Sequence, residues 1–519
     1  MHHNQMSAPP SAEALPINWQ QAELAEIIID GPTNGYSPVS SASATGTATL
    51  KLSSTTTGEM ILNPDTTKRI HETIPSDSNY WLRNGDLLIQ RSNTLEYVGA
   101  AAIYDGPENH YIYPDLMMRV RISNPITRRF VWRYINSQQA KEHFRARATG
   151  TAGNMPKING PTVRALPVPL PPLAEQQRIV AKLEALLARN RHAREALDAI
   201  PSLLERLRQS TLDFAFCGDI TKSWRSGQPE AEPANKLLEH IRAARRRSWE
   251  ERQIKKMQCA GKLPKNDSWK ARYEPPLGLE GISLPPLPRG WCWASFDEVT
   301  LNFDGDRVPI KSEERKSRQG EHPYYGASGI IDSIDSHIFD GEFLLVAEDG
   351  ANLLSRSTPI AFLASGQFWV NNHAHVVQTP ENIIPLKYLA HYLNSIDLSH
   401  FITGSAQPKL TQNNLNKIPI AIAPQKEQIE IVNLLDEVLL KTETINQTVT
   451  NLRGQIARFE RAALARAFCG DLVPQDPNDE PASVLLERIR AEREAAASTP
   501  KQRRSSKATS HTNDPGNQA

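Results

Sequence analysis

The chain carries one long helical pattern twice. Residues 173–216 and 425–468 superpose without a gap when the numbering is shifted by 252, and each pattern ends in the tetrad Phe-Cys-Gly-Asp. The matched positions include Glu175 with Glu427, Val180 with Val432, and Leu183 with Leu435. A duplicated helix of this length predicts a protein built from two copies of one unit.

Shorter matches flank the two helices in the same order. The pattern Leu-Pro-x-x-Trp occurs at 15–19 and again at 287–291, and the sequence FVWRYINS at 130–137 aligns with YLAHYLNS at 388–395. A Pro-Lys pair follows in each copy, ending at Lys157 and Lys409. Each copy therefore runs from a mixed α/β domain through a short entry segment into its long helix.

We therefore predict an α+β fold, with two mixed α/β domains separated by a long antiparallel coiled coil of the repeated helices and related by a pseudo-two-fold axis. The expected segments are a disordered lead at 1–14, domain 1 at 15–172, a helix at 173–216, a basic helical connector at 217–286, domain 2 at 287–424, a helix at 425–468, a C-terminal helical extension at 469–497 and a disordered tail at 498–519.

Apolar side chains recur at 3-4 spacing along both helices, as in the seam of a coiled coil. A helix of this length makes a rod of roughly 65 Å, longer than a domain of this size is wide. Pairing of the helices is therefore favoured over packing of each helix on its own domain. We expect Pro201 to kink the first helix. The predicted seam positions are Val180, Leu183, Leu187, Leu204, Val432, Leu435, Leu439 and Ile456, and the same register places Leu207, Ile445 and Phe459 there.

Composition leaves the class of ligand open. The net charge of +1 hides basic stretches at 236–272 and 501–507, so the total neither supports nor excludes nucleic-acid binding. The four cysteines lack C-x-x-C spacing, which suggests a reducing, cytoplasmic compartment. We expect Cys217 and Cys469, at equivalent positions, to be small buried packing residues. No apolar run is long enough to cross a membrane, and the first residues lack the apolar core of a signal peptide.

Signs of catalysis are missing from the sequence. Neither a phosphate-binding P-loop nor a G-x-G-x-x-G turn occurs, and the Asn/Asp-Pro-Pro-aromatic tetrad with which amino-methyltransferases grip a base is absent. His373 and His375 could share one face of a strand, but a pair without a third ligand is more typical of packing than of a metal site. The adjacent acids Glu348 and Asp349 fit a turn better than a carboxylate pair. We expect no catalytic set and no metal site.

Two similar domains on a rigid rod can meet two separated sites on one extended ligand. Duplex DNA has local two-fold axes that match such a protein, and Arg, Asn and Gln are the side chains that make bidentate base contacts. Each candidate taken singly also fits a solvated loop residue, and the two lysines fit a phosphate contact or a structural clasp equally well. The candidates for DNA contact are Gln90, Arg91, Asn93, Lys157, Asn352, Arg356, Asn371, Asn372 and Lys409.

The motifs that lead into the two helices resemble those of the specificity subunit of type I restriction–modification enzymes. The resemblance rests on the segments LPVPLPPLAEQQ at 166–177 and IPIAIAPQKEQ at 418–428, with NGDLL at 84–88 and YYGASGIIDSI from 324 in support. It covers about 15 to 495. Two departures are that the second copy carries Ala423-Pro424 in place of a double proline, and that Pro201 interrupts the first helix.

This resemblance implies a subunit without activity of its own. Its two target-recognition domains would each read one half of a bipartite DNA sequence, and its helices would set the gap and dock two modification subunits that use S-adenosylmethionine. Restriction subunits that use ATP and Mg would join that core, while this chain would hold no cofactor. The basic helix at 237–258 and its repeat at 485–494 would contact the modification subunits.

Two other functions remain open from the residues alone. The chain could be a stand-alone DNA methyltransferase or nuclease, although it lacks the motifs of either class. It could also be a two-headed tether that joins two protein partners and never touches DNA.

Overall fold

The computed structural model describes residues 15–38, 46–150, 155–228, 230–262, 264, 266–279, 283–404 and 406–498. The predicted lead at 1–14, and all of the predicted tail except Ser498, lie outside these residues. The chain divides into two compact units, one made of residues 1–196 with 451–519 and the other of residues 197–450. None of the helices in the described segments has the length and apolar character that crossing a membrane requires.

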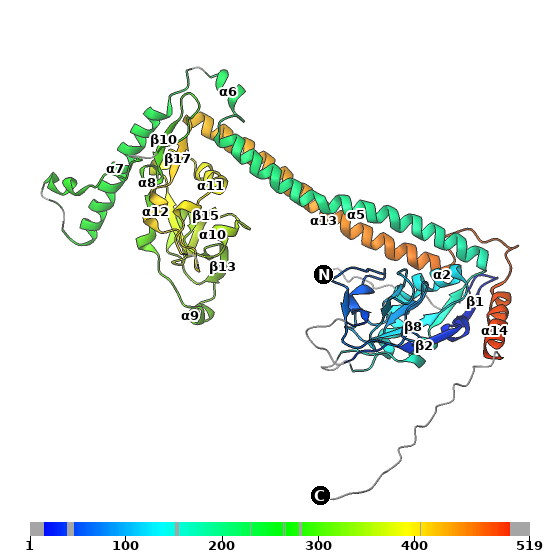
Figure 1. Ribbon diagram of the computed structural model, residues 1–519. Coiled ribbons are helices and arrows are strands. Elements are labelled where there is room, and N and C mark those ends of the chain that lie inside the picture. The colour runs from blue at the N-terminus through cyan, green and yellow to red at the C-terminus, as the bar shows by residue number, and fades with distance from the viewer. Residues whose placement is uncertain are drawn as a thin grey trace, which may run out of the picture. The chain divides into compact units, whose positions relative to one another are not determined.

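The first unit contains domain 1, which combines a four-stranded sheet of order β2-β8-β5-β6, a three-stranded sheet of order β4-β3-β7 and the antiparallel pair β1-β9 (Figure 1). Its elements are β1 Gln20–Glu23, α1 Leu24–Ile27, β2 Asp30–Asn34, β3 Ala48–Leu50, η1 Leu52–Ser54, β4 Thr67–Arg69, β5 Leu87–Gln90, β6 Ala101–Ile103, β7 Tyr111–Ile112, β8 Met117–Arg121, α2 Pro125–Ile135, α3 Gln138–Arg147, α4 Gly160–Arg164 and β9 Pro167–Leu170.

The second unit contains domain 2, whose six-stranded sheet has the order β11-β16-β14-β15-β12-β13 beside the antiparallel pair β10-β17. Its elements are α6 Lys222–Ser226, α7 Ala234–Cys259, η2 Asp267–Arg272, β10 Cys292–Ser295, α8 Phe296–Val299, β11 Leu301–Asn302, η3 Asp304–Asp306, α9 Ser312–Ser317, β12 His322–Gly326, β13 Gly329–Ile334, β14 Phe339–Ala347, α10 Asn352–Ser355, β15 Ala361–Val370, β16 Ala374–Gln378, η4 Pro380–Asn382, α11 Leu386–Ser395, η5 Ser399–Phe401, α12 Gln412–Asn416 and β17 Pro419–Ile422.

The two repeated helices form where the sequence predicts them. Helix α5 spans Leu173–Phe216 and continues through Pro201, and helix α13 spans Gln425–Cys469, one residue beyond the predicted end. Each helix contributes one half to each unit. In the first unit, the start of α5 packs with the end of α13, because Val180 and Leu183 share a core with Ala463 and Ala467. The two halves therefore run in opposite directions within that unit.

The second unit shows the reciprocal arrangement. Leu212 and Ala215, near the end of α5, share a core with Ile431 and Leu435, near the start of α13. Five of the eight predicted seam positions are buried, namely Val180, Leu183, Leu204, Val432 and Leu435. The other three, Leu187, Leu439 and Ile456, are half-buried.

Three positions that the predicted register places in the seam are exposed. Leu207, Ile445 and Phe459 are between 42% and 49% exposed, although the 3-4 spacing places them in the seam. The physical reason is that a straight α-helix drifts by about 20° per heptad relative to a strict seven-residue repeat. A register fixed by the buried ends therefore does not hold over the whole helix.

The repeated Phe-Cys-Gly-Asp tetrad anchors each helix end on a domain. Phe216 packs edge-to-face on Tyr388 and Tyr392 of α11, with ring centroids 5.4 and 5.0 Å away, and Phe468 packs in the same way on Phe130 and Tyr134 of α2. The expectation of buried cysteines is wrong, because Cys217 and Cys469 are exposed. The phenylalanine fills the core, and the next residue faces outward.

Glycine is needed in this tetrad for two reasons. Gly218 and Gly470 both have positive φ, at 76° and 85°, which terminates the helix in the left-handed region. A Cβ at Gly218 would lie 2.5 Å from Pro288, and one at Gly470 would lie 2.6 Å from Pro16. The Leu-Pro motif of each domain therefore packs directly on the end of a long helix.

Helix α14, Ala482–Ser498, completes domain 1 in the way that α7 completes domain 2 (Figure 1). Arg490 of α14 forms an ion pair with Glu26 of α1 at 2.9 Å, and Arg242 of α7 pairs with Glu298 of α8 at 2.5 Å. The C-terminal helical extension predicted at 469–497 belongs to the first unit.

Candidate nucleic-acid interface

Both domains contain the same three-segment loop frame. In domain 1, the backbone of Lys157 exchanges two hydrogen bonds of 2.9 Å with Thr149, and the Ile158 N–H donates to the Arg91 carbonyl at 2.9 Å. In domain 2, the backbone of Lys409 exchanges two such bonds with Thr403, at 2.8 and 2.9 Å. The Leu410 N–H donates to the Glu348 carbonyl at 2.8 Å. We call these segments the loop frame. It fixes the backbone of each predicted lysine and leaves its side chain exposed.

The side chains that the two loop frames display are different. The segment joined to the lysine loop is Arg91-Ser92-Asn93 in domain 1 and Glu348-Asp349-Gly350 in domain 2. A fourth matching bond fixes this alignment, because the Asn93 N–H donates to the Pro156 carbonyl and the Gly350 N–H donates to the Pro408 carbonyl. One backbone scaffold therefore presents a basic, amide-bearing set in one domain and an acidic set in the other.

In domain 2 the frame is held by a charge network centred on Glu348. Its carboxylate lies 2.8 Å from the Arg307 guanidinium and 3.2 Å from the Lys409 ammonium. Burial by itself would raise the pKa of Glu348, but the hydrogen bond from Arg307, the nearby His375 and the Lys409 contact together hold this pKa below its ordinary value. The positive charge of Lys409 is therefore partly neutralised within the protein.

His375 connects this network to the interior. It is 1% exposed, and its Nδ1 lies 2.6 Å from the Asp304 carboxylate while its Nε2 lies 2.8 Å from the Leu410 carbonyl. Both ring nitrogens of His375 therefore face oxygen atoms of the protein. Burial tends to raise the pKa of Asp304, but His375, the Val376 N–H and Arg307 lower it overall.

The two histidines of the His373-Ala-His375 motif do not share a metal site. His373 is exposed, and its Nδ1 lies 2.8 Å from Asp349, whereas both nitrogens of His375 are taken by hydrogen bonds. Within the described segments, no group of three or more His, Cys, Asp or Glu residues is placed to hold a metal ion. Glu348 and Asp349 lie at a turn, followed by Gly350 with a φ of 111°.

Gln90 and Asn93 of domain 1 stabilise the loop through hydrogen bonds within the protein. Gln90 is fully buried, and its amide nitrogen donates to the Leu52 carbonyl and to the Thr55 and Thr56 hydroxyls at 2.9 to 3.1 Å. Its amide oxygen accepts a hydrogen bond from Asn93 at 2.7 Å. A side chain engaged in this way cannot reach a base edge, so Gln90 has a structural role. Arg91 is half-buried, with one guanidinium nitrogen 3.4 Å from the Asp115 carbonyl.

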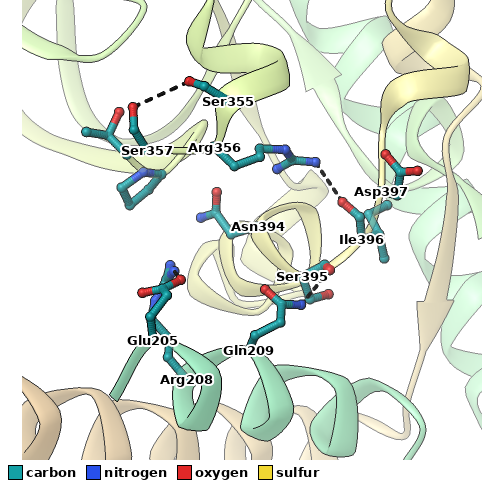
Figure 2. Close-up of a pocket in the computed structure, with 12 residues that line it drawn as sticks. Glu205, Arg208, Gln209, Ser355, Arg356, Ser357, Asn394, Ser395, Ile396 and Asp397 are labelled. Carbon is teal, nitrogen blue, oxygen red and sulfur yellow. Dashed lines mark hydrogen bonds and ion pairs between the residues drawn. The ribbon is translucent and has the colours of Figure 1, made fainter. Parts of the chain in front are cut away.

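Two candidates in domain 2 belong to α10 and its C-cap, and one of them, Arg356, lines a cleft of about 650 Å³ between α10, α11 and the end of α5 (Figure 2). Arg356 extends across this cleft and donates to the Leu393 and Ile396 carbonyls at the end of α11, at 3.3 and 2.7 Å. The Asn352 amide closes its own turn through Ser357 and Thr358. These bonds hold the cleft wall together and leave neither side chain free to read a base.

The remaining two candidates, Asn371 and Asn372, come directly before His373 in the sequence. Asn371 is 6% exposed, and its side-chain oxygen accepts a hydrogen bond from the His373 N–H at 2.8 Å, so it shapes the turn. Asn372 is exposed. The structure therefore leaves Arg91, Lys157, Asn372 and Lys409 as the candidates with accessible side chains, and their contact with DNA stays a prediction.

A family model described as "Type I restriction modification DNA specificity domain" matches residues 16–201 and 296–452, more than half of the chain. The chain belongs to this family. The matched residues include both loop frames, the main sheets of both domains and more than half of each long helix.

Curated members of the family agree with this assignment. A putative type I restriction enzyme specificity subunit from Haemophilus influenzae is 40% identical over 150 residues, which are 29% of this chain and 38% of that protein. The EcoDI specificity subunit of Escherichia coli is 25% identical over 373 residues, which cover 67% of this chain and 73% of that subunit. The EcoKI specificity subunit of Escherichia coli strain K12 is 23% identical, with 66% of this chain and 67% of that subunit covered.

Solved structures show that the fold is shared. A chain from a study of complex assembly and conformational transition in a type I R-M system aligns with a TM-score of 0.57, 18% identity, and coverage of 89% of this chain and 100% of that chain. The HsdS subunit from Thermoanaerobacter tengcongensis aligns with a TM-score of 0.50 and 18% identity, over 89% of this chain and 99% of that chain.

The residues that fix the frames are not among those predicted from the sequence. Arg307, Asp304 and the inward-facing role of His375 become visible only when η3, β16 and the loop before α12 are brought together. One further contact occurs in both copies, and the repeated motifs could have indicated it. The Trp19 indole donates to Glu175 and the Trp291 indole donates to Glu427, both at 3.0 Å, and all four residues occur in the repeated motifs.

Proposed function

We propose that this chain is the non-catalytic DNA-recognition subunit of a type I restriction–modification complex, in which each domain reads one half of a bipartite target. The observation that carries the proposal is the pair of loop frames. Their backbone bonds are the same, but the segment joined to the lysine loop is Arg91-Ser92-Asn93 in one domain and Glu348-Asp349-Gly350 in the other. A common scaffold with different side chains suits two different half-sites.

The two long helices act as the spacer that sets the gap between the half-sites. Support comes from their opposite direction within each unit, taken separately. In the first unit, Arg194 of α5 pairs with Glu460 of α13 at 2.6 Å, and Asn190 donates to the same carboxylate at 3.4 Å. We infer that the pairing continues along both helices as an antiparallel coiled coil, and that a pseudo-two-fold axis relates the two copies.

The partners follow from the same assignment. Two modification subunits would dock on the chain and supply S-adenosylmethionine-dependent methylation, and restriction subunits would add ATP- and Mg-dependent activity. This chain would bind double-stranded DNA in the cytoplasm and hold no cofactor of its own. The names of the similar subunits support this arrangement, and its stoichiometry is part of the proposal.

The test is to exchange one domain. Residues 15–172 are replaced by the corresponding domain of another specificity subunit, and the chain is reconstituted with its modification subunits. Mapping of methylated adenines should then show a change in one half of the target and in neither the gap nor the other half. A change in both halves would contradict domain-by-domain reading, and loss of all DNA dependence would favour a protein tether.

A further inference from the structure

Among the residues that the structure describes, domain 2 has an arm with no counterpart in domain 1. Helices α7 and α14 match from Leu237 and Leu485 onward, but α14 ends at Ser498 whereas α7 continues to Cys259 and is followed by η2. We call residues 246–272 the arm. The stretch from Arg245 to Arg272 contains ten basic and three acidic residues, a net charge of +7. The arm itself is the part of this basic stretch that the structure describes as folded on domain 2.

Aromatic contacts fold η2 of the arm back on α7. Trp249 of α7 stacks on Trp269 of η2, with ring centroids 5.8 Å apart and planes at 22°, and meets Tyr273 edge-on at 5.4 Å. Lys270 lies 3.6 Å from Glu250, which further fixes η2 on α7. The arm therefore presents a defined surface to the rest of domain 2.

A pocket of about 300 Å³ lies where the arm meets β11 and α12. Three basic side chains line it, Arg245, Arg252 and Lys256, together with the amides of Asn302, Gln412 and Asn416. Two carboxylates also line it. Asp297 is engaged by Arg245 at 2.8 Å and by the Leu277 N–H at 2.9 Å, and Glu274 is exposed at the rim.

The remaining donors in this pocket lack acceptors. The Asn302 side-chain oxygen accepts from the Asp304 N–H at 2.8 Å, but its buried Nδ2 has no hydrogen-bond partner. The Arg252 guanidinium lies over the Phe303 ring at 4.9 Å, and among the described residues no carboxylate is ion-paired with Arg252 or Lys256. Burial, with the nearby Arg245, lowers the pKa of Arg252. An unpaired amide donor in a pocket that also holds the half-buried Arg252 and the exposed Lys256 suits an anionic acceptor.

A phosphate group meets this requirement, because its oxygens accept from guanidinium, ammonium and amide donors together. The backbone of DNA is the source that the surroundings favour. Helix α12, which supplies Gln412 and Asn416, begins three residues after Lys409 of the loop frame. The pocket is therefore continuous in sequence with the predicted reading surface of domain 2.

We propose that this pocket binds a backbone phosphate of the DNA duplex next to the half-site read by domain 2, so that domain 2 holds DNA more tightly than domain 1 does. Such a contact fixes position and carries no sequence information. The proposal rests on DNA recognition by the family and goes beyond it by assigning a phosphate site to the arm.

The test compares charge-removing variants of the full chain, reconstituted with its modification subunits. Arg252→Gln and Lys256→Gln remove cations from the pocket, and Lys255→Gln removes the neighbouring exposed cation as a matched control. Binding to a fluorescent duplex is measured by anisotropy across a range of salt concentrations. The pocket variants should weaken binding about tenfold for target and random duplex alike. The slope of log K against log salt should become shallower by about one for each phosphate that the protein no longer neutralises.

Asn302→Asp separates a binding role from a structural one. The new carboxylate keeps the acceptor for the Asp304 N–H and places an acceptor beside Arg252, so the thermal stability of domain 2 should hold or rise while DNA affinity falls. A salt slope equal to that of Lys255→Gln would overturn the proposal. So would unchanged DNA affinity with loss of modification-subunit binding, which would make the arm a protein contact. If DNA recognition itself is wrong, the wild-type chain shows no salt-dependent binding, and this outcome distinguishes the two failures.

Discussion

Asp304 supports the loop frame of domain 2 through His375, which contacts the Leu410 carbonyl. It accepts hydrogen bonds from His375 at 2.6 Å and from the Val376 N–H at 2.8 Å, and its side chain is 7% exposed. Because its folded-state pKa is lowered, its contribution to stability is fully present above its ordinary value of 3.8 and is lost as the pH falls through the lowered folded value.

Asp304→Asn should therefore reduce the stability of domain 2 by about 2 kcal/mol at neutral pH, because hydrogen bonds to a charged group are the strong ones. The difference between wild type and variant should shrink as the pH is lowered below about 4. Thermal unfolding followed by tryptophan fluorescence from pH 7 to pH 3 measures this difference. A difference that is constant over the whole range would mean that the carboxylate is not the stabilising species.

The roles of single side chains are the least predictable from the sequence. Gln90 is a candidate because Gln can read adenine, yet its strand β5 is buried at every position, and its amide satisfies three acceptors of the adjacent turn. Arg356 is a candidate because Arg contacts phosphate and guanine, yet it caps the end of α11. In both cases the residue type permits DNA contact, and a long-range hydrogen bond decides the role.

At the scale of the element, the helix limits were predictable and the seam was predictable only near the helix ends. A proline-containing segment precedes each of α5 and α13, and a Phe-Cys-Gly-Asp tetrad ends each of them. The bounds predicted from these motifs agree with the observed helix bounds to within one residue. Burial near the ends comes from the domains, which pack on Leu183 and Leu435. Toward the middle, neither domain core includes the helix side chains, and local spacing does not settle which of them face inward.

Two leucines of α13 provide a matched test of this difference. Leu435 is 1% exposed in the core of the second unit, whereas Leu440 is 70% exposed. Leu435→Ala should reduce the stability of that unit by about 3 kcal/mol, through reduced apolar burial and the cavity left behind. Leu440→Ala should change it by less than about 0.5 kcal/mol. Denaturant unfolding of the full-length variants measures both values, and equal losses would mean that the helix packs on a different face.

At the scale of the whole molecule, the repeat predicted two copies but not how the chain is distributed between them. The end of α13 and the helix α14 belong with domain 1, and the end of α5 and the helix α7 belong with domain 2. Each domain is thus completed by chain segments that come after the other domain in the sequence or connect to it. These segments are the end of one long helix and the helix that follows it. Internal similarity alone cannot reveal this exchange, because the same motifs would match if each copy folded on itself.

The exchange makes a specific prediction about the gap between the half-sites. If the helices form one antiparallel spacer, both must be lengthened together, because an insertion in one helix alone misaligns its contacts with the other. Seven residues inserted after Ala196 in α5 and after Thr450 in α13 add two helical turns, about 10 Å, and keep the apolar face nearly in register. The gap in the methylated sequence should then lengthen, by at most about three base pairs at 3.4 Å per step.

Both half-sites should stay as they are, because neither loop frame is altered. The measurement is adenine methylation mapping on a library of targets whose gap varies in length, with the single-helix insertions as controls. These controls should lose assembly or activity without acquiring a new gap. An unchanged gap in the doubly extended chain, with full methylation activity, would show that the spacing is set by the docked modification subunits and not by α5 and α13.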